Sequence, residues 1–211
     1  MENVEKYKDT FLNALLKGNR HVCQQLMQEF RASNPSIKIL YEEIFKVSLY
    51  DIGDLWENNK IGVAIEHMAS AIVEGLMNEL FSEIMSLERV NKKIIISCVE
   101  KEEHQIGGKM VADIFEKNGW DACYLGANTP INELVEFCDL VNPDLIGLSL
   151  SVMDNFQSLL KEITELRTIT KIPILVGGQA LQRAGVQLSE EFADLFYLEN
   201  LKSVENYLKG V

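Results

Sequence analysis

The sequence predicts an α/β protein with an N-terminal four-helix bundle over residues 1–88 and a doubly wound, five-stranded parallel sheet over residues 89–211. Two observations support this fold class. The first part repeats apolar side chains at the spacing of one helix face throughout. From residue 92 onward, short apolar runs rich in β-branched residues alternate strictly with helical segments, as in parallel sheets covered by helices.

The helical half contains four segments with helical periodicity. They are predicted at about residues 4–18, 20–32, 37–57 and 63–86. Gly18-Asn19 closes the first helix, and Asn34-Pro35 separates the second from the third. Ser36 is the expected N-cap of the third helix, because its hydroxyl can accept an amide proton of the first turn. A turn at residues 58–60 precedes the fourth helix, and the short connections favour a bundle.

The second half contains five apolar, strand-like runs. They are predicted at residues 92–99, 121–126, 144–151, 172–178 and 194–198. Helices are expected at about residues 107–118, 131–140 and 155–167, near Leu181, and after the last strand. This series predicts a flavodoxin-like, Rossmann-like strand order, in which ligands bind at the carboxyl ends of the strands. A loop or short linker near residues 87–89 joins the two domains.

Composition excludes several classes of function. The formal net charge is −12, so direct binding of nucleic acid, which needs clustered Lys and Arg, is not expected. No apolar run reaches the roughly 18 residues needed to span a bilayer, and the charged N-terminus does not resemble a signal peptide. The four cysteines include no CxxC pair and are expected to be reduced, which favours a cytoplasmic location.

One loop carries a candidate metal ligand. His104 follows the first predicted strand and precedes a helix, so its imidazole can project from the strand ends into open space. Glu102, two residues earlier, is the natural carboxylate to accept the other ring N–H and orient the imidazole. Gly107 and Gly108 allow a bulky ligand to approach the backbone. The alternative is a solvated or helix-capping histidine in an acidic loop.

The same loop resembles that of a known family. Glu102-x-His104-x-x-Gly107 is similar to the Asp-x-His-x-x-Gly motif of base-off, His-on cobalamin-binding domains, with Glu102 where that family usually has Asp. Three further matches follow in order, each at a predicted strand end. They are residues 124–130, the segment Ser149-Leu150-Ser151 in place of Ser-x-Leu or Ser-x-Thr, and the pair Gly177-Gly178. Ser151 stands at the third position of that motif.

The resemblance implies how cobalamin would be held. In this family the dimethylbenzimidazole base leaves cobalt, and the tail that carries it enters the sheet beside the third and fourth strands. His104 would replace the base as the lower cobalt ligand, and Ser149 would hydrogen-bond the displaced base or the tail near it. Gly177 and Gly178 would let the tail lie against the backbone. The alternatives are tight turns for the glycines and a core serine bonded to backbone for Ser149.

A second motif lies in the helical half. Trp56 near the end of one helix and Glu66-His67 in the next resemble the Trp-x9-Glu-His motif of CarH-type cobalamin photoreceptors. There the motif caps the 5′-deoxyadenosyl group above cobalt, and a second cap histidine stands where this chain has Glu57. Without that resemblance, core packing for Trp56 and a solvated helix start for Glu66-His67 are the ordinary alternatives.

The leading functional prediction is a light-responsive sensor that holds adenosylcobalamin, with methylcobalamin as the other possible form, between the helical cap and the sheet. Because the chain starts directly at the cap, no winged-helix DNA-binding domain is expected, so the signal would pass through a protein partner or a change in homo-oligomeric state. Catalysis is not expected. The alternatives are a corrinoid methyl carrier for a methyltransferase system, a protein that binds a second chromophore, and an interaction module without a cofactor.

Overall fold

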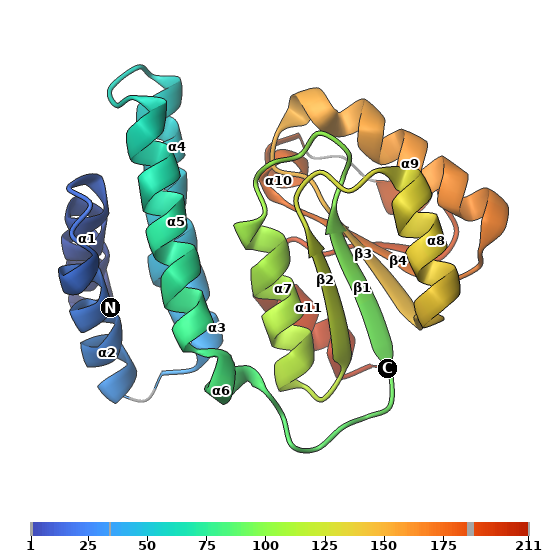
Figure 1. The fold of residues 1–211 in the computed structure, drawn as a ribbon, viewed down its shortest axis with the longest axis horizontal. Coiled ribbons are helices and arrows are strands. Elements are labelled where there is room, and N and C mark those ends of the chain that lie inside the picture. Colours follow the sequence, from blue (N-terminus) through green and yellow to red (C-terminus); the bar gives the residue numbers. More distant parts are fainter. Residues whose placement is uncertain (1, 34, 185–187, 211) are drawn as a thin grey trace. The chain divides into compact units, whose positions relative to one another are not determined.

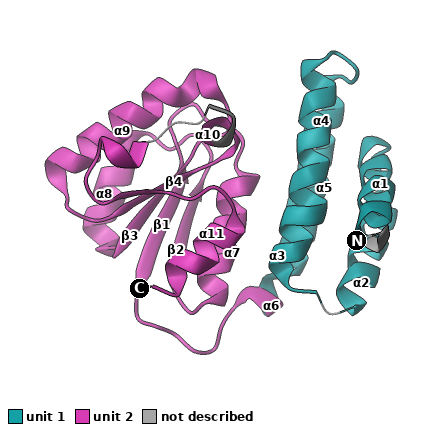
Figure 2. Ribbon diagram, turned by 180° about the vertical axis from the view of Figure 1, so that it is seen from behind, with its two compact units in different colours: residues 1–82 teal, residues 83–211 magenta. Residues whose placement is uncertain are grey.

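The computed structural model describes residues 2–33, 35–184 and 188–210. The chain divides into two compact units, Met1–Ser82 and Glu83–Val211 (Figure 2). The predicted domain boundary at residues 88–89 falls in the segment that joins the last short helix of the helical region to the first strand. No helix among the described residues is both long and apolar enough to cross a membrane.

Unit 1 is helical, as predicted. Its elements are α1 (Glu2–Leu16), α2 (Arg20–Ala32), α3 (Ile37–Ile39), η1 (Leu40–Lys46), α4 (Val47–Glu57) and α5 (Val63–Glu79), followed by α6 (Phe81–Ile84) at the unit boundary. The Ser36 side chain accepts the Ile39 amide, so the predicted N-cap is confirmed. The predicted third helix is continuous over residues 37–57, with a π-helical stretch at η1. Of the predicted Asn34-Pro35 break, Asn34 lies outside the described residues.

The predicted fourth helix over residues 63–86 is too long. α5 ends at Glu79, because the backbone at Leu80 turns to φ −85° and ψ −1° and its amide bonds to the carbonyls of Met77 and Asn78. These short-range bonds tighten the last turn and end the regular i to i−4 pattern. The side chain of Leu80 is buried at this point, so packing stabilises the break.

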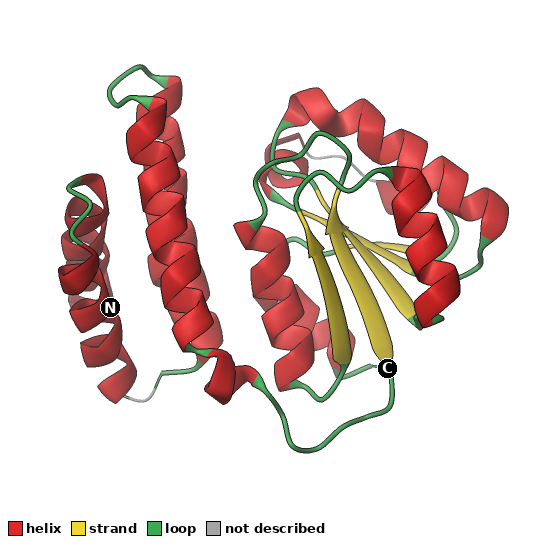
Figure 3. Cartoon of the chain, viewed as in Figure 1, coloured by secondary structure: helices red, strands yellow, loops and turns green. Residues whose placement is uncertain are grey.

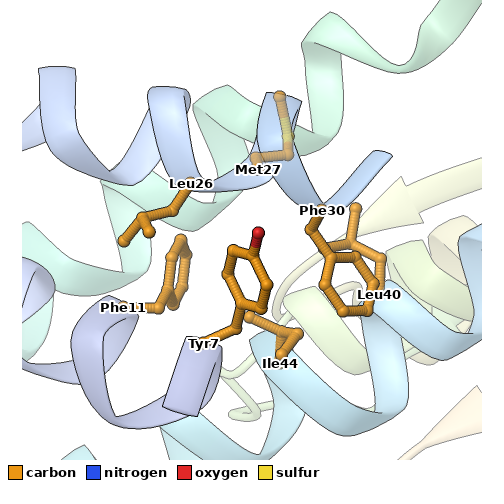
Figure 4. A pocket seen from close by; sticks show the side chains of 7 residues that line it. All are labelled: Tyr7, Phe11, Leu26, Met27, Phe30, Leu40 and Ile44. Atoms are coloured by element: carbon orange, nitrogen blue, oxygen red, sulfur yellow. The ribbon is translucent and has the colours of Figure 1, made fainter. Parts of the chain in front are cut away.

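Aromatic and aliphatic side chains fill the core of unit 1. Phe45 stacks on Phe11 and on Tyr41, with ring centroids 5.4 and 5.9 Å apart. Figure 4 shows the neighbouring apolar site, and its gaps leave no room for a water molecule. The site is lined by Tyr7, Phe11, Leu26, Met27, Phe30, Leu40 and Ile44. Close packing of this kind makes the bundle a rigid support for its exposed residues.

Unit 2 is a parallel sheet with the order β2-β1-β3-β4-β5, as predicted (Figures 1 and 3). The strands are β1 (Lys93–Cys98), β2 (Asp121–Gly126), β3 (Leu145–Ser149), β4 (Ile174–Gly177) and β5 (Leu195–Tyr197). The helices are α7 (Ile106–Lys117), α8 (Ile131–Val141), α9 (Phe156–Ile169), α10 (Gln179–Ala184) and α11 (Leu201–Leu208), with short 3-10 turns at η2 (Met153–Asn155) and η3 (Leu188–Glu190). α7 and α11 cover one face, and α8 and α9 cover the other (Figure 1).

The sheet brings three strand ends together. β1 is flanked by β2 and β3, so the chain order reverses at β1, and ligands in this fold bind outside the carboxyl ends of the strands at such a point. Cys98 of β1 pairs with Ser149 of β3, which in turn pairs with Gly177 of β4. The loops that follow these strands therefore meet at one edge of the sheet.

Candidate cobalamin-binding site

The loop between β1 and α7, residues 99–105, is anchored by its own backbone amides. Four successive amides, those of residues 99 to 102, each have an acceptor. In chain order the acceptors are the Ser149 carbonyl at 3.2 Å, Glu162 Oε1 at 2.6 Å, Asn128 Oδ1 at 2.7 Å and the Val99 carbonyl at 2.9 Å. They come from β3, α9, the loop after β2 and the loop itself. Because several elements hold it, the loop presents its side chains in a defined geometry.

Glu102 is the centre of this loop. Its side chain is fully buried, and Oε1 accepts the His104 amide at 2.9 Å and lies 2.6 Å from His104 Nδ1. Oε2 accepts the amides of Ser151 and Val152, both at 2.9 Å. The Asn155 side-chain amide lies 3.5 Å from the same oxygen. The carboxylate thus links the loop after β1 to the loop after β3.

The surroundings keep Glu102 ionised. Burial alone raises the pKa of this carboxyl, but the hydrogen bonds donated by the ring and amide of His104 and by the amides of Val152 and Ser151 outweigh burial and lower it to about 2. An ionised carboxylate can only accept, so Nδ1 of His104 carries the proton that it donates to Glu102. In the neutral ring the lone pair then lies on Nε2, the nitrogen suited to ligate a metal.

His104 itself is placed for ligation. Its side chain is 51% exposed although its carboxylate partner is buried, so the ring extends outward from the strand ends. Glutamate in place of aspartate does not prevent the contact, as the 2.6 Å distance shows. A metal held in a macrocycle needs one imidazole below it, and His104, oriented through Nδ1 by Glu102, fits that requirement. The residues present therefore fit the lower side of a cobalamin.

Gly107 differs from the glycines at the end of β4. A side chain at Gly107 would meet no atom within 4 Å, so the start of α7 is open beside His104. A Cβ at Gly177 would lie 2.9 Å from the Leu198 carbonyl oxygen, and one at Gly178 would lie 2.1 Å from that of Leu150. Gly178 also has φ +121°. Close backbone packing therefore already requires both glycines, and their contact with the cofactor tail stays a prediction.

Ser149 lies at the end of β3 in a small buried cluster. The neighbouring Cys98 directs its thiol to the His104 carbonyl at 3.7 Å, and burial raises the pKa of that thiol to about 12. A Cβ added to Gly108 would lie 3.6 Å from the Ser149 Cβ and 3.3 Å from the ring of Tyr124. α7 thus packs closely on the strand ends. The contact of Ser149 with the displaced base remains a prediction.

The cap motif occupies one pair of neighbouring helices in unit 1. Trp56 lies at the end of α4 and is 43% exposed, so it is not a core residue of the bundle. Glu66 lies in the first turn of α5, where its Oε1 accepts the Ser70 hydroxyl at 2.9 Å and its Oε2 lies 2.6 Å from His67 Nδ1. An exposed indole and an oriented carboxylate–imidazole pair are therefore available for recognition of a ligand.

Three residues that hold the loop between β1 and α7 in place were not identified from the sequence. Asn128 belongs to the 124–130 segment, and its φ of 50° is a conformation that asparagine tolerates well, but no role was assigned to it. No sequence pattern indicates that Asn155 belongs to the site. Glu162 stands among Leu159, Ile163 and Leu166, the buried face of α9, so a charged residue in an apolar helical stripe was the signal that could have identified it.

Fold and site together define a protein that holds a large cofactor at the switch point of a parallel sheet. The chain belongs to the B12 binding domain family: one family profile of that description matches residues 92–199, and a second matches residues 7–81. It is a cobalamin-binding protein, which confirms the predicted cofactor and removes the alternative of a module without one. The form of cobalamin is a separate question.

The relatives fall into two groups. The HTH-type transcriptional repressors CarA and CarH of Myxococcus xanthus are 28% identical over 152 residues and 25% identical over 181 residues. These alignments cover 67% and 84% of this chain but 51% and 59% of the repressors, so the chain spans little more than half their length. Dimethylamine corrinoid protein 2 of Methanosarcina acetivorans is 25% identical over 150 residues, which cover 69% of each chain.

Solved structures share the fold. The monomethylamine corrinoid protein of Methanosarcina barkeri superposes with a TM-score of 0.82 at 18% identity, covering 98% of this chain and 99% of that one. A second match, in the methanol:cobalamin methyltransferase complex MtaBC of Methanosarcina barkeri, has a TM-score of 0.51 at 15% identity and covers 98% and 81% of the two chains. The predicted combination of a helical region and a five-stranded parallel sheet is thus confirmed.

Proposed function

We propose that the chain binds cobalamin base-off, with His104 Nε2 as the lower ligand to cobalt and Glu102 as the group that orients the imidazole. The observation that carries this proposal is the 2.6 Å contact between His104 Nδ1 and a fully buried carboxylate. Two backbone amides of the loop after β3 hold the other oxygen of that carboxylate, so the acceptor that orients the imidazole is itself fixed in place.

We further propose that the protein is a light-responsive sensor for adenosylcobalamin and not an enzyme. When bound, this cofactor supplies a weak, photolabile cobalt–carbon bond. Trp56, Glu66 and His67 would recognise the upper adenosyl group, and its loss would change their packing. Support comes from the exposed indole, the Glu66–His67 pair and the similarity to the CarA and CarH repressors. Output would pass to a protein partner or through a change in oligomeric state. A cytoplasmic location stays a prediction from the sequence.

A corrinoid methyl carrier is the second candidate. It is favoured by the superposition on the monomethylamine corrinoid protein over nearly the full length of both chains. A carrier must expose the upper face of cobalt to a methyltransferase partner, whereas the three cap residues are suited to cover a bulky group there. The two functions therefore differ in what occupies the upper face and in whether light changes it.

The test uses purified protein mixed with adenosylcobalamin in the dark, desalted, and then illuminated with green light. Retained cofactor whose visible spectrum changes on illumination, together with a shifted elution volume, supports the sensor. Retained cofactor with no change in assembly, and methylcobalamin bound equally well, supports the carrier. His104→Ala tests the lower ligand: loss of the imidazole-coordinated spectrum is expected, and an unchanged spectrum and affinity would remove His104 from the site.

A further inference from the structure

Glu162 is a buried acid that the proposed function does not yet use. It lies on α9 between Leu159 and Ile163, both fully buried, and is itself 1% exposed. A carboxyl group at such a position is costly unless hydrogen bonds or charges compensate it. Its surroundings therefore indicate what the group does.

The carboxyl holds the start of the loop that carries the site. Its Oε1 accepts the backbone amide of Glu100 at 2.6 Å, two residues before Glu102. Its Oε2 is buried and has no hydrogen-bond partner among the described residues. One oxygen thus positions the loop, and the other is left without compensation.

The charged groups around Glu162 do not fully compensate a negative charge on its carboxylate. The titratable groups that influence it or feel its charge are Glu100 from the loop, Cys98 at the end of β1, and Lys161 and Glu165 from α9 itself. Lys161 Nζ lies 3.8 Å from a carboxylate oxygen of Glu100 and 3.9 Å from one of Glu165. The positive charge of Lys161 is therefore shared between Glu100 and Glu165. Burial raises the pKa of Glu162 to about 7, with the Glu100 amide and Lys161 opposing the rise.

We propose that Glu162 is a positioning residue that tightens or loosens the loop bearing Glu102 and His104 as it loses or gains a proton. The ionised carboxylate accepts the Glu100 amide in a charge-assisted hydrogen bond, and the neutral acid accepts it more weakly. Because residues 99 to 102 are held by consecutive amides, a weaker bond at Glu100 loosens the segment that presents His104. The inference rests on the proposed role of His104 as cobalt ligand.

The first experiment uses the cofactor-free full-length protein and follows the Glu100 amide by NMR from pH 5.5 to 8.5. In the wild type the amide proton should move downfield with rising pH in one transition near neutrality. Glu162→Gln keeps a carbonyl acceptor but cannot titrate, so this transition should vanish. Glu165→Gln, one turn along the same helix and more exposed, is the matched control and should retain it. A wild-type amide that does not move in this range, or the same transition in Glu162→Gln, would overturn the proposal.

The second experiment measures hydroxocobalamin binding and the imidazole-coordinated spectrum at pH 6 and pH 8. Removing a group that supports a metal ligand costs roughly 10- to 100-fold in affinity, so Glu162→Ala should weaken binding about tenfold at pH 8. Glu162→Gln should bind with a smaller difference between the two pH values than the wild type. If Glu162→Ala does not fold, the Gln variant and the NMR transition still decide.

The His104→Ala variant separates the two proposals. If it binds and absorbs as the wild type does, the proposed lower ligand is wrong, while the NMR transition still tests the hold of Glu162 on the loop. If it loses imidazole coordination but both Glu162 variants match the wild type at both pH values, the role of His104 stands and the positioning role of Glu162 is refuted.

Discussion

Replacing Glu102 with glutamine should destabilise unit 2 even without cofactor. The carboxylate accepts two hydrogen bonds on each oxygen, from the ring and amide of His104 and from the amides of Ser151 and Val152. Glutamine has one acceptor oxygen and one NH2 group. In either orientation of the side-chain amide, the NH2 group therefore faces two N–H donors, those of His104 or those of Ser151 and Val152. Buried donors without acceptors are costly.

The magnitude follows from the pKa of Glu102. Its fall from 4.5 in a free side chain to about 2 corresponds to about 3 kcal/mol of stability contributed by the ionised form. Because the pKa in the folded protein is the lower one, this stability is fully present above about pH 4.5. It is lost as the pH falls through 2. Glu102→Gln should therefore lower the free energy of unfolding by about 3 kcal/mol at pH 7 and by less at pH 4.

The assay is urea denaturation followed by Trp120 fluorescence in a Trp56→Phe background. Trp120 is buried in unit 2, and the chain has two tryptophans, so this background reports on the sheet domain alone. Glu103→Gln, the exposed neighbour in the same loop, is the matched control and should change stability by no more than about 0.5 kcal/mol. Equal unfolding free energies for Glu102→Gln and Glu103→Gln at pH 7 would refute the reasoning.

Three further predictions concern the ligand, the cap and the backbone. His104→Ala should weaken cobalamin binding roughly 10- to 100-fold, measured by equilibrium titration, and binding as tight as the wild type would exclude it as ligand. Trp56→Ala should reduce the preference for adenosylcobalamin over methylcobalamin, measured by competition, and an unchanged preference would favour the methyl carrier. Gly178→Ala should lower the free energy of unfolding by more than about 2 kcal/mol, because φ +121° and the Leu150 carbonyl leave no place for a Cβ. Gly107→Ala, at an open helical position, is its control and should unfold at the same or slightly higher urea concentration.

The pairing of Glu102 with His104 was predictable because the two residues lie in one loop, two positions apart. The same holds for Glu66 and His67, which are adjacent on α5. Strand and helix positions in unit 2 followed from periodicity, since buried parallel strands and amphipathic helices differ clearly in their apolar spacing. The early end of α5 did not, because it depends on how Leu80 packs rather than on a local breaker residue.

The sequence alone determined the two kinds of architecture and the carboxylate–imidazole pair, because both depend on residues close together in the chain. The cofactor was implied by the resemblance of several separate motifs to a known family. Only the tertiary structure decided how that pair is supported. Ser151 and Glu162 meet the loop after β1 across 49 and 62 residues, because β1 lies beside β3 and the buried face of α9 belongs to the same apolar cluster as both strands. The position of Glu162 on an apolar helix face indicates that its carboxyl group has a polar partner. The register of the sheet determines which loop it holds.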